Sequence, residues 1–305
     1  MYARRLAIVL VFFSFASRGE CQQVDAKKLC ELIRTPKGSM LIGIGFNTQR
    51  GFVIAGESTD HSAEIAALEK ALCGDAMDAE RYYRLSELYD DEDKCKQASA
   101  KAADLFWKQL QADPRNGRLA MRLGQSLPVE NEAEGERLLR LAVQLAPKDG
   151  ECWMALGDFL WGKIFDALLT PTTRGMSQME TLMNIVITRS VPKENLQAAY
   201  KIANEANACM EKAVTVAPRQ PRHYVARALS RSLNIVLDEG SRALADDKRD
   251  LVDCMCRIVE QLSQRKVIAD IQKAAELEPT NPRAQVFAGA VELLPLFGNE
   301  LAKLK

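Results

Sequence analysis

Cysteine is the residue type with the most obvious chemical potential in this chain, which carries 8 cysteines and only 2 histidines. Cys254 and Cys256 form the closest pair, but the sequence around them predicts a helix, on which residues two apart point to different faces. There is no Cys-x-x-Cys motif and no second pair at the spacing of metal ligands. We therefore expect neither a zinc site nor another bound cofactor. The cysteines are Cys21, Cys30, Cys73, Cys95, Cys152, Cys209, Cys254 and Cys256.

Two other short patterns superficially suggest ligand chemistry. Gly43 and Gly45 resemble part of a phosphate-binding loop, but the third glycine, the following lysine and the helix context of such a loop are absent. The acidic run from Asp90 to Asp93 lacks the glycine and the distal glutamate of a calcium-binding loop. We interpret this run as a solvated turn whose negative charge favours the start of the next helix.

His61 and His223 are the remaining candidates for acid–base chemistry. Neither lies in a recognisable catalytic motif, although a dyad assembled across the fold stays open as an alternative. The sequence therefore does not predict an enzyme.

Prolines punctuate the chain at the ends of similar helical patterns. Pro114, Pro147, Pro218 and Pro279 each close an apolar pattern of helical period, and each is followed by a new helix signal. Proline suits such a turn because its missing amide is harmless in a first helical turn. The chain thus repeats a two-helix unit, and such units stack because none can bury its apolar face alone.

The residues within each unit follow a common grid. The first-helix positions are Tyr82, Leu85, Ser86 and Tyr89, then Ala120, Leu123, Gly124 and Leu127, then Trp153, Leu156, Gly157 and Leu160. The second-helix positions are Gly135, Leu139 and Ala142, then Ala206, Met210 and Ala213, then Val267, Ile271 and Ala274. This grid resembles that of the tetratricopeptide repeat (TPR) family. The resemblance implies an all-α, TPR-like solenoid of helical hairpins; an irregular bundle of amphipathic helices is the alternative.

The resemblance also implies a groove lined by positions two, five, nine and twelve of each first helix. The groove residues predicted for a partner are Tyr83, Glu87, Arg118, Met121, Arg122, Gln125, Glu151, Met154, Asp158 and Trp161. The lysine and asparagines with which some members of the family bind a terminal carboxylate are missing, and Arg118 and Arg122 are the only comparable residues. A stripe of methionine and aromatic residues is also common in a protein core, which is the competing interpretation.

The N-terminal residues predict export. Arg4 and Arg5 precede an apolar run from Leu6 to Phe15, which small residues follow. The run is shorter than a bilayer span, so a cleaved signal peptide over residues 1–21 is favoured over a membrane anchor. We expect a periplasmic or secreted protein with no membrane span after signal removal. In that compartment the cysteines could form disulfides, with buried free thiols as the alternative.

Residues 22–63 differ in character from the rest. They predict a short helix over Asp25–Arg34 and a β-hairpin from Ser39–Phe46 and Phe52–Ala55, expected to cover the apolar end of the solenoid or to contact a ligand. The repeat domain spans residues 64–305, with insertions at about 163–197 and 234–264. Apolar stretches predict helices in both insertions at Met179–Ile187 and Leu251–Leu262, while Asp238–Gly240 predict a break.

The charge balance bears on the class of partner. The 41 basic and 41 acidic residues leave no basic excess, so nucleic acid is not an expected partner. The sequence favours an exported, TPR-like binding or scaffolding protein whose partner is a protein or peptide. The alternative is a structural subunit of an envelope or secretion assembly, docking through its insertions.

Overall fold

A computed structural model describes the chain in six ranges: residues 44–47, 51–54, 61–168, 191–245, 251–264 and 266–279. The predicted signal peptide, the helix at 25–34 and the stretch 179–187 lie outside these ranges. Within them, no helix is long and apolar enough to cross a membrane.

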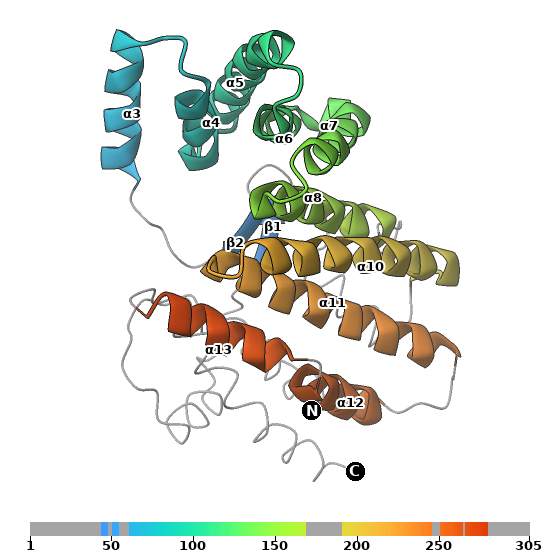
Figure 1. Ribbon diagram of the computed structural model, residues 1–305. Coiled ribbons are helices and arrows are strands. Elements are labelled where there is room, and N and C mark those ends of the chain that lie inside the picture. The colour runs from blue at the N-terminus through green and yellow to red at the C-terminus, as the bar shows by residue number, and fades with distance from the viewer. Residues whose placement is uncertain are drawn as a thin grey trace.

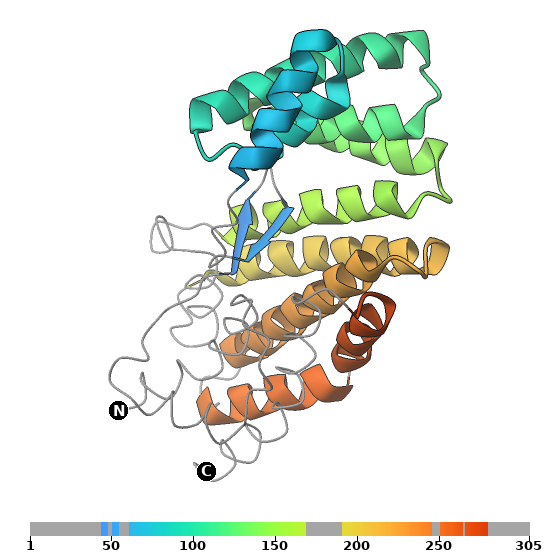
Figure 2. The same ribbon diagram turned by 90° about the vertical axis from the view of Figure 1, so that its left-hand side faces the viewer.

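Helices make up nearly all of the described structure. In chain order they are α3 (Ser62–Gly74), α4 (Ala79–Leu88), α5 (Glu92–Ala112), α6 (Gly117–Ser126), the 3-10 turn η2 (Val129–Asn131), α7 (Glu132–Leu145), α8 (Gly150–Leu168), α10 (Lys193–Val216), α11 (Pro221–Ala245), α12 (Leu251–Gln264) and α13 (Val267–Leu277). Helix α4 packs against α5, α6 against α7, and α8 against α10, and α11 continues the series with α12 and α13 (Figures 1 and 2). We call α4, α6, α8 and α11 the first helices.

Side-chain caps start several of these helices. Asp78, Asp91 and Asn116 accept hydrogen bonds from backbone amides at the starts of α4, α5 and α6, with donor–acceptor distances of 3.0, 2.8 and 3.2 Å. Such caps satisfy amides that have no partner within the helix. The acidic run that begins at Asp90 is therefore a turn and a helix start, as its sequence indicates.

The same contacts recur from one helix pair to the next. Trp153 Nε1 donates to the carbonyl of Pro147 at 2.9 Å, and Tyr224 Oη donates to the carbonyl of Pro218 at 3.0 Å. Each aromatic side chain thus ties an early turn of a first helix to the proline before it. Trp153 is only partly buried and packs against the core.

Close helix approaches recur in the same way. A β-carbon on Gly117 would lie 2.7 Å from Ala146 Cβ, and one on Gly150 would lie 2.8 Å from Ala217 Cβ. Further along α8, Gly157 faces Met210 of α10, as the repeat grid predicts. The core that these contacts enclose runs without interruption from α4 to α11.

Replacing Gly150 by alanine should destabilise the protein by about 1 to 3 kcal/mol, because the new methyl group would overlap the Ala217 methyl and crowd the carbonyl oxygen of Ala213, 3.0 Å away. Gly74→Ala is the matched control, since no atom lies within 4 Å of a β-carbon there. Denaturant unfolding of both variants measures the difference. Equal stabilities would show that the start of α8 can move away from α10 at little cost.

The two strands lie beside the helices. Strands β1 (Ile44–Asn47) and β2 (Gly51–Ile54) pair antiparallel, with Ile44 opposite Ile54 and Asn47 opposite Gly51. Strand β2 packs against α8, near the middle of the series of helices (Figure 2). The sequence favoured a position over one end of the repeats, with contact to a ligand as the alternative, whereas β2 lies beside α8.

The helices that flank the first predicted insertion are long. Helix α8 continues to Leu168 and α10 begins at Lys193, so both edges of the insertion at 163–197 belong to long helices. The helix predicted at 251–262 is present as α12.

The predicted break at Asp238–Gly240 was wrong, because α11 is continuous to Ala245. Arg242 pairs with Asp238 at 2.9 Å and with the fully buried Glu239 at 3.1 Å, and Gln261 of α12 donates to Glu239 at 2.5 Å. Bonds within α11 and from α12 thus stabilise the helix where its glycine alone would weaken it.

Candidate functional site

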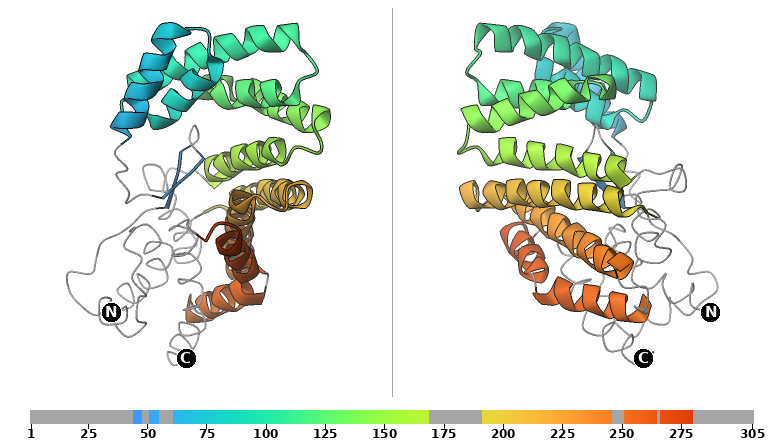
Figure 3. Two further views of the ribbon diagram at one scale, coloured as in Figure 1. Left: turned by 60° about the vertical axis from the view of Figure 1, so that its left-hand side comes forward. Right: turned by 90° about the vertical axis from the view of Figure 1, so that its right-hand side faces the viewer.

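Charged pairs join each first helix to the next. Arg122 of α6 pairs with Glu80 of α4 at 3.0 Å, and Arg118 of α6 pairs with Asp149, just before α8, at 2.5 Å. Glu151 of α8 is bound by Arg222 of α11 through two guanidinium nitrogens, with Nε 3.1 Å from Oε1. These pairs link the first helices in series, and we call the side of the molecule on which they lie the first-helix face; Figure 3 shows the arrangement of the helices.

Four of the predicted groove residues come together where α4 meets α6. The Arg122 guanidinium lies 4.6 Å from the centroid of the Tyr83 ring and donates to Gln125 Oε1 at 3.3 Å. Burial raises the pKa of Tyr83, and the neighbouring Glu87 carboxylate raises it further, so the phenol stays protonated at neutral pH. Tyr83 also packs edge-on against Phe106 of α5, with ring centroids 6.5 Å apart.

His223 is the buried member of the α8–α11 contact. Its side chain is fully buried, and its Nε2 lies 3.0 Å from Glu151 Oε1. Burial lowers the pKa of the imidazole, and the positive charge of Arg222 lowers it further. Glu151, the partner of His223, is also bound by Arg222. These contacts hold α11 against α8.

Three predicted residues form a stripe along α8. Met154, Asp158 and Trp161 are spaced so that they share one side of the helix. Trp161 is buried and its ring centroid lies 6.1 Å from that of Phe165. Asp158 is half-buried, and burial raises its pKa to about 7.

The predicted groove residues thus divide by burial. Three belong to the core: Tyr83, Met121 and Trp161. The others reach the surface in part or fully: Glu87, Arg118, Arg122, Gln125, Glu151, Met154 and Asp158. The first three residues are therefore part of the protein core, which was the competing interpretation of the methionine and aromatic stripe.

Neither a model of a known protein family nor a curated protein matches the sequence.

Sequence reasoning missed three residues of the first-helix face. Asp149, Arg222 and His223 all contact predicted groove residues or their partners. Arg222 holds position two of α11, equivalent to Glu151 in α8, so extending the grid by one unit would have found it. The position-two residues alternate in charge along the series: Glu80, Arg118, Glu151 and Arg222. Of these, Glu151 pairs directly with Arg222, whereas Glu80 pairs with Arg122 and Arg118 with Asp149.

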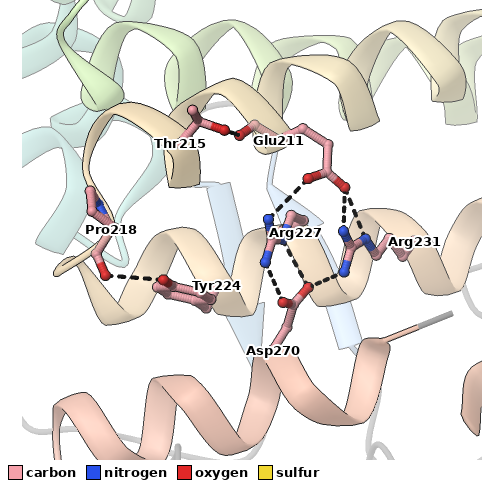
Figure 4. Close-up of polar contacts among 7 residues, drawn as sticks. All are labelled: Glu211, Thr215, Pro218, Tyr224, Arg227, Arg231 and Asp270. Atoms are coloured by element: carbon pink, nitrogen blue, oxygen red, sulfur yellow. Dashed lines mark hydrogen bonds and ion pairs between the residues drawn. The ribbon is translucent and has the colours of Figure 1, made fainter.

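A second charged cluster lies between α10, α11 and α13 (Figure 4). Asp270 of α13 accepts from Arg227 Nε at 2.9 Å and from Arg231 Nη1 at 2.7 Å. Glu211 of α10 accepts from Arg227 Nη1 at 2.9 Å and from Arg231 Nε at 3.0 Å. The two arginines and two carboxylates balance in charge, so this cluster fastens three helices together and leaves no charge for a ligand.

The cysteines that the structure describes are all free thiols. Burial raises the pKa of Cys152 to about 11 and that of Cys209 to about 12, which keeps both thiols protonated and unreactive. Cys254 is buried and Cys256 only partly so, as expected for residues on different sides of a helix. Across the described ranges, no group of three or more metal-binding side chains could hold an ion.

Proposed function

We propose that this chain is a TPR-like, non-catalytic protein-binding or scaffolding protein that holds a peptide or protein segment on its first-helix face. The observation that carries the proposal is the recurrence of the same contacts at Pro147 and Pro218, and at Gly117 and Gly150. Because successive units repeat their packing, equivalent side chains of successive first helices form a row. A row of this kind offers a partner several contacts along its length.

The composition of the row suits a polypeptide. Arginines alternate with carboxylates along it, and Met154 adds apolar surface. Peptide backbone and side chains present both charges together with apolar groups, whereas nucleic acid requires a basic excess. We also propose that the protein is exported, on the strength of the residues before Gln22.

Selection from a displayed library of random nine-residue peptides tests the proposal. Peptides enriched on the wild-type protein should bind Arg118→Glu on the order of tenfold more weakly, because the substitution reverses a largely exposed charge in the middle of the row. Fluorescence anisotropy of the enriched peptides provides the measurement.

Lys108→Glu is the matched control, since Lys108 is an exposed residue of α5 paired only with Asp104. The free energy of unfolding of both variants should equal that of the wild type to within the small contribution of a surface ion pair. Failure to enrich any peptide, or enriched peptides that bind both variants equally well, would contradict binding on the first-helix face.

A further inference from the structure

Asp158 is an exception among the acidic residues of the first-helix face. Its carboxylate is half-buried near the middle of α8, and no described residue forms a hydrogen bond or ion pair with it. By contrast, the acidic residues beside it in the row are all paired with arginine: Glu80 with Arg122, Glu87 with Arg84, Asp149 with Arg118 and Glu151 with Arg222. The missing cation at Asp158 therefore needs an explanation.

The surroundings of Asp158 make an unpaired carboxylate unfavourable. Most of α8 is apolar, and Met154 and Trp161 stand one turn before and about one turn after Asp158 on the same side. Burial raises the pKa of Asp158, and no charged neighbour within the described ranges offsets that effect. A carboxylate in such a place gains stability from any cation that reaches it.

The basic residue nearest to Asp158 in sequence is already engaged, and so is a basic residue of the preceding helix. Lys163 of α8 binds Glu136 of α7 at 2.6 Å, and Arg140 of α7 binds Glu205 of α10 at 2.6 Å. Asp166, the next acidic residue along α8, is exposed. Asp158 is therefore the half-buried carboxylate of α8 for which a ligand could supply the cationic partner.

We propose that Asp158 receives the positively charged side chain of a bound partner segment, a lysine or an arginine whose aliphatic stem packs on Met154. The proposal rests on the proposed function and adds to it the chemical class of the residue recognised. Long basic side chains suit this site because their stems cover apolar surface while their charged ends reach a polar group.

The test uses the peptides enriched from the random nine-residue library. Peptides enriched on the wild-type protein should contain lysine or arginine, and changing that residue to norleucine or glutamine should weaken binding on the order of tenfold to a hundredfold. The same change should have little effect on binding to Asp158→Asn, because the interaction is already lost. Asp158→Glu keeps the charge and should retain the preference for a basic residue.

Asp104→Asn is the control, since Asp104 is an exposed residue of α5 bound to Lys108 at 2.9 Å. Enriched peptides without a basic residue, or an equal loss of affinity in wild type and Asp158→Asn, would overturn the role of Asp158. Either result would leave the proposed function standing if Arg118→Glu still weakened binding. The absence of any enriched peptide would overturn both.

Discussion

Asp270→Asn should destabilise the protein by about 3 to 5 kcal/mol. The substitution keeps the shape of the side chain but removes its charge, which leaves Arg227 and Arg231 with one carboxylate, that of Glu211, between them. Asp270 is 3% exposed and both arginine side chains are about 15% exposed, so water cannot replace the lost partner. Urea unfolding of the wild type and the variant measures the effect.

Glu276→Gln provides the control on the same helix. Glu276 pairs with Lys273 at 2.9 Å, but both side chains are well exposed, so the change should alter the free energy of unfolding by less than about 0.5 kcal/mol. Equal losses for the two variants would mean that the cluster between α10, α11 and α13 is solvated. It would then contribute no more than a surface pair.

The partners of the arginines in this cluster could not be predicted from the sequence. Arg227 and Arg231 are four residues apart, so on a helix they share a face, and like charges at this spacing are destabilising. A reader of the sequence would place such a face in solvent. In the structure two carboxylates from other helices lie opposite the arginines, and only the tertiary arrangement supplies them.

The repeat pattern was predictable because its determinants are local. Small residues such as Gly124 and Gly157 lie where helices approach closely, and Pro147 and Pro218 lie between helices, so residue type and spacing reveal them. The partner of each charged residue on the first-helix face was harder to predict. Asp149 lies in a turn outside the grid, and its pairing with Arg118 depends on how neighbouring helices are aligned.

Local signals also misled at one point. Asp238 and Gly240 are poor helix formers and predicted a break, but α11 continues because Glu239 is buried between Arg242 and Gln261. The bonds of one buried carboxylate outweigh a propensity penalty of about 1 kcal/mol for the glycine. Helix limits in the expanded part of the chain therefore depend on contacts with α12.

Asp158→Asn should make the protein more stable at pH 8, by about 1 to 3 kcal/mol. Burial raises the pKa of Asp158 to about 7 in the folded protein, whereas an aspartate in an unfolded chain titrates near 3.9. Between these values the folded state keeps a proton that the unfolded state has lost. The free energy of unfolding contributed by Asp158 therefore falls as the pH rises from about 4 to 7, and it stays low above pH 7.

Asparagine carries no titrating proton, so the difference in stability between the variant and the wild type should be small at pH 4.5 and should grow to its full value by pH 8. Urea unfolding of both proteins over this range measures the difference, and other carboxylates cancel because both proteins share them. Asp104→Asn should show no gain at pH 8, since the Lys108 ammonium holds the pKa of Asp104 below its usual value. An Asp158→Asn variant no more stable than wild type at pH 8 would mean that the ionised carboxylate is well solvated. A gain would show that the chain retains, on the surface proposed for its partner, a carboxylate that reduces its own stability until a cation arrives.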